Sequence, residues 1–431
     1  AGGLLVRIVA AALLDPDMRL RGDENIYTRH ALELLETGRL DTGWFVRPPL
    51  YFVFMAGTHL LSDALPVSWT LLTKWLQCIA SVATAIPVYR GARRIAGTRA
   101  ARFAAAFLLF DPTLIGYTSL LWPETLFTLL VAIVFDGVAD LDRRSAARSL
   151  FLGTMTGLAL LLKPVFGLFA VLWAGSWLMQ LGWSRALRHL LLVGGAAALV
   201  ISPWLIRNQL QYGPSILLEN QGPYNLWIGN AKASPPEVLR DWRRLGDPVL
   251  RNEVAMDRAL EAITEDPARF ARNYLSRIVN LWGFEFFVFR HVVLGGYGWH
   301  SRWQLQAAFW SMQIGWALSL LAVCAGLGYA IRDPAIRLLL VYAAAFTLMV
   351  AAMVGTTRFR VPFAYLIAVL AGVGLDRAIA RGLTWRSLVA AGLVGTLLFA
   401  SATKPLFWKI ITNDFADGRD LNRTDWIYFR Y

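Results

Sequence analysis

The sequence is dominated by long apolar stretches separated by short connections, and every second connection is rich in arginine. These arginine clusters lie at 90–102, 143–148, 185–188, 332–337 and 377–386. Short loops rich in Lys and Arg remain on the cytoplasmic side of a membrane. With 57% hydrophobic residues and a mean hydropathy of +0.48, the chain has more apolar surface than one soluble core can bury. The fold class predicted is therefore an all-α polytopic membrane protein.

The apolar stretches predict about eleven transmembrane helices. They lie at 1–14, 66–89, 102–118, 121–139, 149–162, 165–181, 188–206, 305–330, 336–356, 361–380 and 386–403. The first is shorter than the ~20 residues that a crossing needs, so we expect a short first helix or one that begins upstream. We treat 1–403 as one transmembrane module, and 404–431 as a short outer tail.

Two long segments are predicted to lie on the outer face, at 15–65 and 207–304. A membrane crossing by "PPLYFVFMAGTHLL" (48–61) would invert the charge rule for everything downstream, so we place it in the outer interface. The preceding "NIYTRHALELLETG" has the spacing of an amphipathic helix that ends at Gly38. The 207–304 segment is typical of surface helices broken at Asp266–Pro267.

Several function classes are excluded or disfavoured. The net charge of +13 comes mainly from short arginine clusters between spans, which argues against nucleic acid as a partner. Cys78 and Cys324 both fall inside predicted spans and have no metal-ligand spacing. No glycine-rich phosphate loop, zinc-type histidine pair or Ser-His-Asp order stands out. No cytoplasmic connection is long enough for a domain that binds nucleotide sugars.

Acidic residues at the outer edge are the first candidates for chemistry. Asp23 and Glu24 follow the first apolar stretch, where the alternative is a solvated loop or carboxylates favoured by a helix dipole. Glu124 opens a span directly after Trp122–Pro123, and the same dipole alternative holds for it.

Basic residues at the same edge are the second group. Lys163 and Arg207 interrupt or end apolar runs, and anchoring at the interface is the alternative role for both. Arg358 and Arg360 lie on a short outward connection, against the charge rule. An anionic ligand there would account for both cations.

A series of motifs then carries a resemblance to a known family. "GDE", "RPPLYFVFMAG", "WPETLF", "LLLKP", "PWLIRNQLQYG", "GPYNLWIGN" and "RFRVPF" occur in this order. The chain resembles, over about 1–380, the GT-C membrane glycosyltransferases of the protein O-mannosyltransferase and aminoarabinose transferase superfamily, in the bacterial branch called family 39. The tail at 404–431 departs from larger members, which carry a soluble C-terminal domain there.

The resemblance implies roles for individual residues. Asp23 matches the catalytic base of the family, with Glu24 beside it, and Glu124 matches the second acidic position. The positions that match donor-phosphate or cavity-rim cations are Lys163, Arg207, Arg358 and Arg360. The positions that match the substrate cavity are Arg47, Tyr51, Tyr224 and Asn225.

The expected activity is inverting transfer of a monosaccharide from a polyprenyl-phosphate donor to an acceptor hydroxyl of a lipid, glycan or protein. One carboxylate takes the acceptor's proton, and arginines hold the leaving phosphate. The resemblance places the enzyme in a bacterial cytoplasmic (inner) membrane with its site facing outward. A divalent cation is compatible with the family but not required by this sequence. The alternatives left open are a lipid-linked sugar transporter or flippase, an O-antigen-ligase-type enzyme, and a non-enzymatic scaffold.

Overall fold

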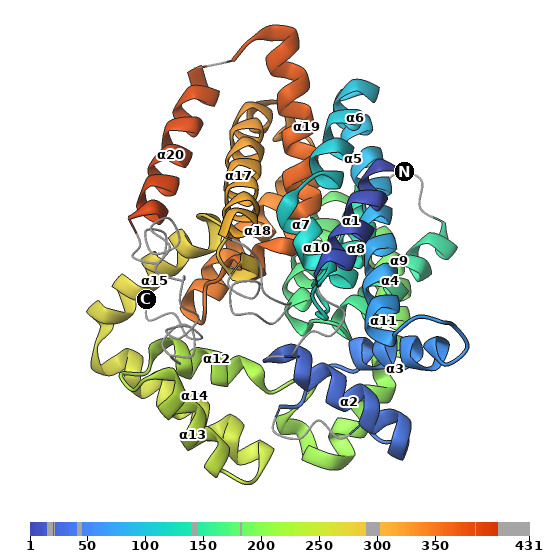
Figure 1. Cartoon of the computed structure of the whole chain (residues 1–431), viewed down its shortest axis with the longest axis vertical. Coiled ribbons are helices and arrows are strands. Elements are labelled where there is room, and N and C mark those ends of the chain that lie inside the picture. Colours follow the sequence, from blue (N-terminus) through green and yellow to red (C-terminus); the bar gives the residue numbers. More distant parts are fainter. Residues whose placement is uncertain are drawn as a thin grey trace.

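The computed structural model describes residues 1–14, 20, 22–40, 45–139, 145–181, 183–289, 302–383 and 385–403. Across these residues the chain is built from helices, without a strand, which confirms the all-α fold class. Most of the apolar helices run in roughly the same direction and form a bundle (Figure 1). The predicted outer tail at 404–431 lies outside the described residues.

The bundle helices coincide with the predicted spans. In the first half they are α1 (Gly2–Leu13), α4 (Trp69–Ala83), α5 (Ala85–Ala96), α6 (Thr98–Leu109), α7 (Pro112–Thr118), α8 (Glu124–Val138) and α9 (Ala146–Leu160). They are followed by η1 (Pro164–Phe166), α10 (Gly167–Leu181) and α11 (Trp183–Tyr212). The second half contributes α17 (Arg302–Ala330), α18 (Pro334–Ala352), η3 (Thr357–Phe363), α19 (Ala364–Arg381) and α20 (Trp385–Ala402).

The number of crossings stays a prediction. Among the described residues, six helical stretches are long and apolar enough to span a membrane, and three shorter apolar helices accompany them. The difference from eleven arises where proline or a short element interrupts the helix. Asp111–Pro112 separates α6 from α7, and the 15 residues of α8 rise only ~22 Å, less than a bilayer core.

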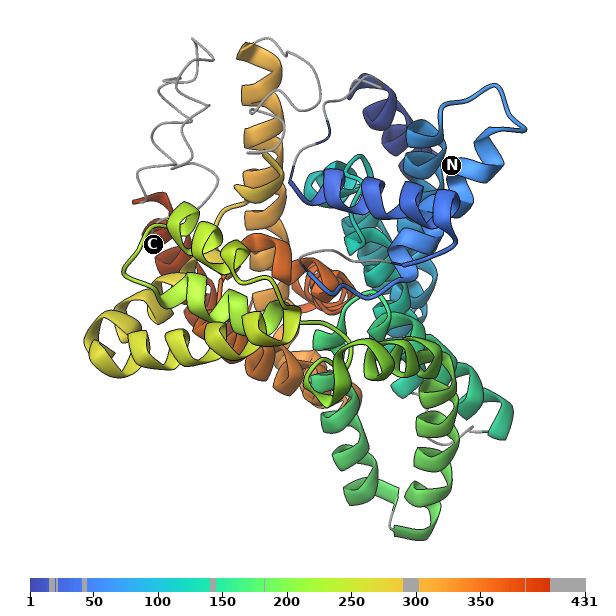
Figure 2. The ribbon, with the colours of Figure 1, turned by 90° about the horizontal axis from the view of Figure 1, so that it is seen from below.

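The predicted outer-face helices form one end of the molecule. They are α2 (Asp23–Thr37), α3 (Leu50–Ser62), η2 (Gly213–Ser215), α12 (Gln221–Asn230), α13 (Pro235–Arg244), α14 (Pro248–Glu265) and α15 (Pro267–Trp282). Most of them gather at the end of the bundle opposite the connection between α19 and α20 (Figure 1). Seen from that end, α2 and the α13–α14 pair lie on different sides (Figure 2).

Local predictions in these segments are confirmed with one correction. Gly38 ends α2 in the left-handed conformation, with φ of 66°, and Asp266 separates α14 from α15 and accepts a hydrogen bond from the N–H of Arg269. The predicted boundary at 207 is wrong, because α11 continues without a break to Tyr212 despite Pro203. The first helical turns of the outer segment therefore belong to a bundle helix.

The end of the bundle opposite these outer helices is closed by ion pairs between helices. Arg94 of α5 lies 3.6 Å from Asp136 and 3.8 Å from Asp333, and thereby links α5 to the end of α8 and to the start of α18. Arg99 of α6 is paired at 2.5 Å with Asp376 of α19. These contacts join five helices at the arginine-rich end.

Helices α17 and α19 approach each other unusually closely. A Cβ placed on Gly326 would lie 2.0 Å from the carbonyl oxygen of Leu370, and one on Gly374 would lie 1.8 Å from that of Ala322. Only glycine fits at both positions without moving a backbone. The two helices are thus packed backbone against backbone.

Candidate functional site

Arg358 is the centre of a charged cluster where the outer segments meet the bundle. Its Nη1 donates to Asp23 Oδ2 at 2.5 Å, and its Nε donates to Glu124 Oε1. The guanidinium also lies over the ring of Trp122, 4.5 Å from the centroid. One arginine from η3 therefore bridges two carboxylates that are far apart in the sequence.

Two further cations complete the cluster. Lys163 Nζ donates to Glu124 Oε1 at 2.6 Å, and Arg47 Nη2 donates to Asp23 Oδ1 at 2.9 Å. Glu124 is fully buried, whereas 26% of the Asp23 side chain is exposed. Asp23 is thus the carboxylate of the cluster that an incoming molecule can reach.

The chain positions these side chains with short, well-determined elements. Asp23 and Glu124 stand in the first turns of α2 and α8, where the helix dipole favours a carboxylate. Lys163 is the extended residue that precedes Pro164, and Arg47 precedes Pro48. Each charged group therefore sits at the end of an element, at the outer edge of the bundle.

Aromatic rings support the cluster from the side. Arg47 lies over the ring of Tyr27 at 5.1 Å and over that of Phe45 at 5.4 Å. Tyr27 packs edge-on against Tyr51, whose hydroxyl donates to Gln77 Oε1 at 2.8 Å. Tyr51, a predicted cavity residue, is fully buried and holds this wall in place.

The charges determine the ionisation of the reachable groups. Burial alone raises the pKa of Asp23, but the charges and hydrogen bonds of Arg47 and Arg358 outweigh it and hold that pKa well below its ordinary value. Burial lowers the pKa of Lys163, and Glu124 partly offsets this effect. Asp23 is therefore an ionised carboxylate throughout the physiological pH range.

Glu24 has a structural role that differs from the role of Asp23. It is buried, and its Oε1 accepts a hydrogen bond from the N–H of Leu121 at 3.1 Å. This contact anchors the start of α2 to the turn that precedes Glu124. Glu24 thus holds the backbones that carry the two other carboxylates.

The expected pair of Arg358 and Arg360 around one phosphate is not formed. Arg360 Nη2 donates to Glu285 Oε2 at 3.1 Å, its Nη1 donates to two backbone carbonyls, and its guanidinium stacks on Trp316 at 3.8 Å. About three residues make one turn of a 3₁₀ helix, so side chains two positions apart diverge. The donors of Arg360 are therefore directed to Glu285 and to backbone carbonyls, and not to the carboxylates that Arg358 bridges.

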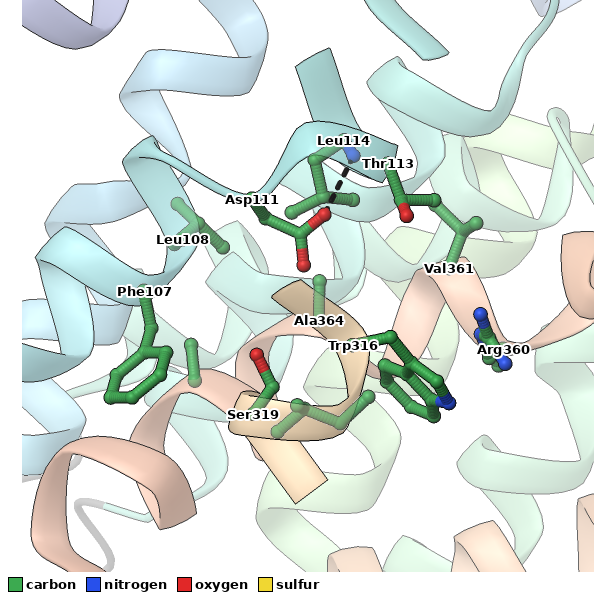
Figure 3. A pocket seen from close by; sticks show the side chains of 12 residues that line it. Phe107, Leu108, Asp111, Thr113, Leu114, Trp316, Ser319, Arg360, Val361 and Ala364 are labelled. Atoms are coloured by element: carbon green, nitrogen blue, oxygen red, sulfur yellow. Dashed lines mark hydrogen bonds between the residues drawn. The ribbon is translucent and has the colours of Figure 1, made fainter. Parts of the chain in front are cut away.

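Arg360 also lines a cavity that does not open onto the cluster. This cavity is lined mainly by apolar residues of α6, α7, α17 and α19. Figure 3 shows Asp111 at one wall, accepting a hydrogen bond from the N–H of Leu114, and Arg360 at another. None of Asp23, Glu124, Lys163 and Arg358 lines it.

The remaining predicted residues, Arg207, Tyr224 and Asn225, lie on α11 and α12. Arg207 donates to the carbonyl of Leu40 at 2.6 Å and lies over the ring of Trp204 at 4.8 Å. Tyr224 packs with Phe45 and Trp242 in a small core beneath α12, and Asn225 is half-buried on the same helix. Arg207 thus fixes the outer loops, as an interfacial anchor does.

The cluster does not fit a divalent cation between its carboxylates. Arg358 occupies the position between Asp23 and Glu124 that a bridging metal would need. Within the described ranges, no group of three His, Cys, Asp or Glu side chains could hold a metal ion. Arginine supplies the positive charge there instead.

Three supporting residues were missed by the sequence analysis. Tyr27 stands one helical turn after Asp23, so its spacing could have signalled it. Trp122 lies two residues before Glu124 and outside helical spacing, so it carried no such signal. Glu285 carried no signal, because its partner Arg360 lies 75 positions away.

Comparison with known protein families gives a match for part of the chain. Residues 46–206 match the family described as dolichyl-phosphate-mannose-protein mannosyltransferase. The resemblance seen in the sequence is confirmed over this segment, which contains Arg47, Glu124 and Lys163. No curated protein sequence matches the chain.

Solved structures show weaker similarity. ArnT from Cupriavidus metallidurans bound to undecaprenyl phosphate is 15% identical, with 94% of this chain and 87% of that chain covered and a TM-score of 0.42. The oligosaccharyltransferase AglB from Archaeoglobus fulgidus, in complex with an inhibitory peptide and a dolichol-phosphate, is 16% identical, with 96% and 56% covered and a TM-score of 0.43.

Proposed function

We propose that this protein is a membrane glycosyltransferase that moves a monosaccharide from a polyprenyl-phosphate donor to an acceptor hydroxyl, with inversion at the anomeric carbon. The family match over 46–206 supports glycosyl transfer from a lipid-linked donor. The observation that carries the proposal is the Arg358 bridge between the partly exposed Asp23 and the buried Glu124. The arginine-rich connections support a cytoplasmic membrane with the cluster on its outer face.

The cluster provides each group that the transfer needs. The acceptor oxygen attacks the anomeric carbon while Asp23 takes its proton, and the bond to the donor phosphate breaks, so that polyprenyl phosphate leaves. Arg358, Arg47 and Lys163 are placed to hold that phosphate as its negative charge grows. Glu124 orients Arg358 and Lys163, because it accepts hydrogen bonds from both.

The same contacts couple donor binding to the strength of the base. With Arg47 and Arg358 both on Asp23, this carboxylate is a weak base. A donor phosphate competes with Asp23 for the two guanidinium groups and frees carboxylate oxygens for the acceptor hydroxyl. Asp23 is therefore a stronger base when the donor is bound. Without the donor it is a weak base and takes few protons from water.

The decisive experiment is the Asp23→Asn variant in purified protein. Asn keeps the size of the side chain but cannot take a proton, and loss of a general base lowers rates by ~10²–10⁴. Release of polyprenyl phosphate from labelled polyprenyl-phosphate sugars should fall by this factor, while inhibition by free polyprenyl phosphate persists. The reaction should proceed in detergent, where a transporter has no second compartment.

The matched control is Glu36→Gln, since Glu36 is an exposed carboxylate on the same helix. This variant should keep parent turnover. Full activity of Asp23→Asn with a donor and acceptor that the parent uses would remove Asp23 as the base. Donor movement only across sealed vesicles, without release of polyprenyl phosphate, would favour a transporter.

A further inference from the structure

Glu219 is a carboxyl group beside the cluster that neither the family resemblance nor the proposed reaction uses. It lies in the short segment between η2 and α12. Its neighbour Asn220 is joined to Val46 by two hydrogen bonds: Val46 N–H donates to Asn220 Oδ1 at 3.0 Å, and Asn220 N–H donates to the Val46 carbonyl at 3.3 Å. Glu219 is thereby held next to Arg47, the residue after Val46.

The other side of this segment is equally well anchored. The carbonyl of Leu218 accepts a hydrogen bond from Trp204 Nε1 at 2.9 Å, and that of Leu217 accepts one from Asn208 Nδ2 at 2.8 Å. Ile216 is buried against Leu161, two residues before Lys163. The backbone around Glu219 is therefore fixed between the segments that carry Arg47 and Lys163.

The surroundings of Glu219 contain charge but no ion-pair partner. Its strongest charged neighbours are Lys163 and Arg47, which already pair with Glu124 and Asp23. Within the described part of the chain, Glu219 takes part in no hydrogen bond or ion pair. Burial raises its pKa to about 7 against the pull of these two cations, so its neutral form is substantially populated at neutral pH.

A half-buried carboxyl of this kind suits a hydroxyl-bearing ligand. An ionised carboxylate repels a phosphate, whereas it accepts hydrogen bonds from hydroxyl groups, and its neutral form can also donate one. The donor's sugar is attached directly to the phosphate that Arg47 and Lys163 are proposed to hold, so the sugar ring must lie within a few ångströms of these cations. In the proposed reaction Asp23 binds the acceptor hydroxyl, and Glu124 is buried against Arg358 and Lys163, which leaves Glu219 available for the ring.

On the basis of the proposed function, we infer that Glu219 binds a hydroxyl group of the donor's sugar and thereby helps to determine which polyprenyl-phosphate sugar the enzyme accepts. The contact is with the sugar and not with the lipid phosphate. Loss of Glu219 therefore changes discrimination among sugars and leaves recognition of the bare lipid phosphate intact.

The test compares Glu219→Ala with the parent on polyprenyl-phosphate hexoses that differ at one hydroxyl. A lost hydrogen bond of this kind lowers kcat/KM by ~10–100-fold. For the preferred donor we expect this loss of kcat/KM. We also expect a smaller ratio between its kcat/KM and that of a donor without the contacted hydroxyl. The inhibition constant of free polyprenyl phosphate should stay within about twofold of the parent's, because this lipid carries no sugar and therefore makes no hydrogen bond to Glu219.

Two controls separate the outcomes. Glu253→Ala, at an exposed position of α14, should leave both quantities unchanged, and Glu219→Gln should lose less than Ala because its amide oxygen still accepts. An unchanged donor preference in Glu219→Ala, or an equal weakening of free polyprenyl phosphate, overturns the inference while the proposed function stands. A parent that turns over no polyprenyl-phosphate sugar overturns both.

Discussion

Replacement of Arg358 by Met should destabilise the protein because it leaves a buried carboxylate without its main counter-charge. Glu124 is fully buried, and its Oε2 accepts no hydrogen bond from the described residues. In Arg358→Met, Glu124 keeps only Lys163, and Asp23 keeps only Arg47. Removal of one partner from a buried ion pair costs ~3–5 kcal/mol of unfolding free energy.

A second substitution should restore much of this loss. In the double variant Arg358→Met with Glu124→Gln, the buried carboxylate is gone. Lys163 loses its carboxylate partner, and because burial already lowers its pKa, its amine can give up the proton and does not remain as an unpaired charge. We expect the double variant to be more stable than Arg358→Met by ~2 kcal/mol or more, although donor turnover remains abolished. The non-additivity would locate the effect in this ion pair and not in lost packing over Trp122.

The assay is reversible denaturant unfolding in detergent, followed by tryptophan fluorescence, for the parent, both single variants and the double variant. Arg337→Met, at an exposed arginine of α18, serves as the control and should change the unfolding free energy by less than ~0.5 kcal/mol. Additive penalties in the double variant, or a loss below ~1 kcal/mol in Arg358→Met, would refute the reasoning.

The remaining predictions concern three other parts of the molecule. Arg360→Met should lower the midpoint of thermal unfolding, and the added substitution Glu285→Gln should recover it. The donor KM should rise far less in Arg360→Met than in Arg358→Lys. An equal rise in both variants would show that Arg360 contacts the donor phosphate directly. Burial raises the pKa of Glu219 to about 7, whereas in the unfolded chain its pKa is ~4.5. The contribution of neutral Glu219 to the unfolding free energy is therefore fully present below pH ~4.5 and is lost as the pH rises through about 7. The midpoint of the parent should therefore fall relative to Glu219→Gln between pH 5 and pH 8, and a constant difference would contradict this. The topology can be tested with single cysteines after the buried native cysteines are replaced. A Cys at the exposed position of Arg244 should react with an impermeant thiol reagent in intact cells, whereas a Cys at the exposed position of Arg93 should not. The reverse labelling pattern would show that the topology is inverted.

The sequence predicted the fold class and most of the charged cluster for identifiable reasons. Apolar stretches and arginine clusters are local patterns, so they predicted the positions of the bundle helices well. Glu124 and Lys163 were found because they interrupt apolar sequence, and Arg358 because a cation there opposes the charge rule. Asp23 was found as a carboxylate after the first apolar stretch, and the family resemblance gave it its catalytic role. The order of the motifs then assigned Arg47 to the same cavity.

The sequence did not predict which charges would pair. Arg358 and Arg360 are equivalent by composition, but the 3₁₀ turn sends one to Asp23 and Glu124 and the other to Glu285. Glu24 is likewise equivalent to Asp23 in the sequence, but in α2 its side chain is directed to the backbone N–H of Leu121. These outcomes depend on backbone geometry and on partners many positions away, which no local pattern records.

The closed, arginine-rich end of the bundle bears on how the donor arrives. Alternating access requires two halves of a protein to rock apart at each membrane surface in turn. Here Arg94 joins α5 to α8 and to the start of α18, Arg99 joins α6 to α19, and α17 and α19 touch through glycine, so that end resists separation. Under the proposed function, a site that opens only at the other end would take its donor from one leaflet of the membrane, and transfer of the donor between leaflets would then fall to a separate protein.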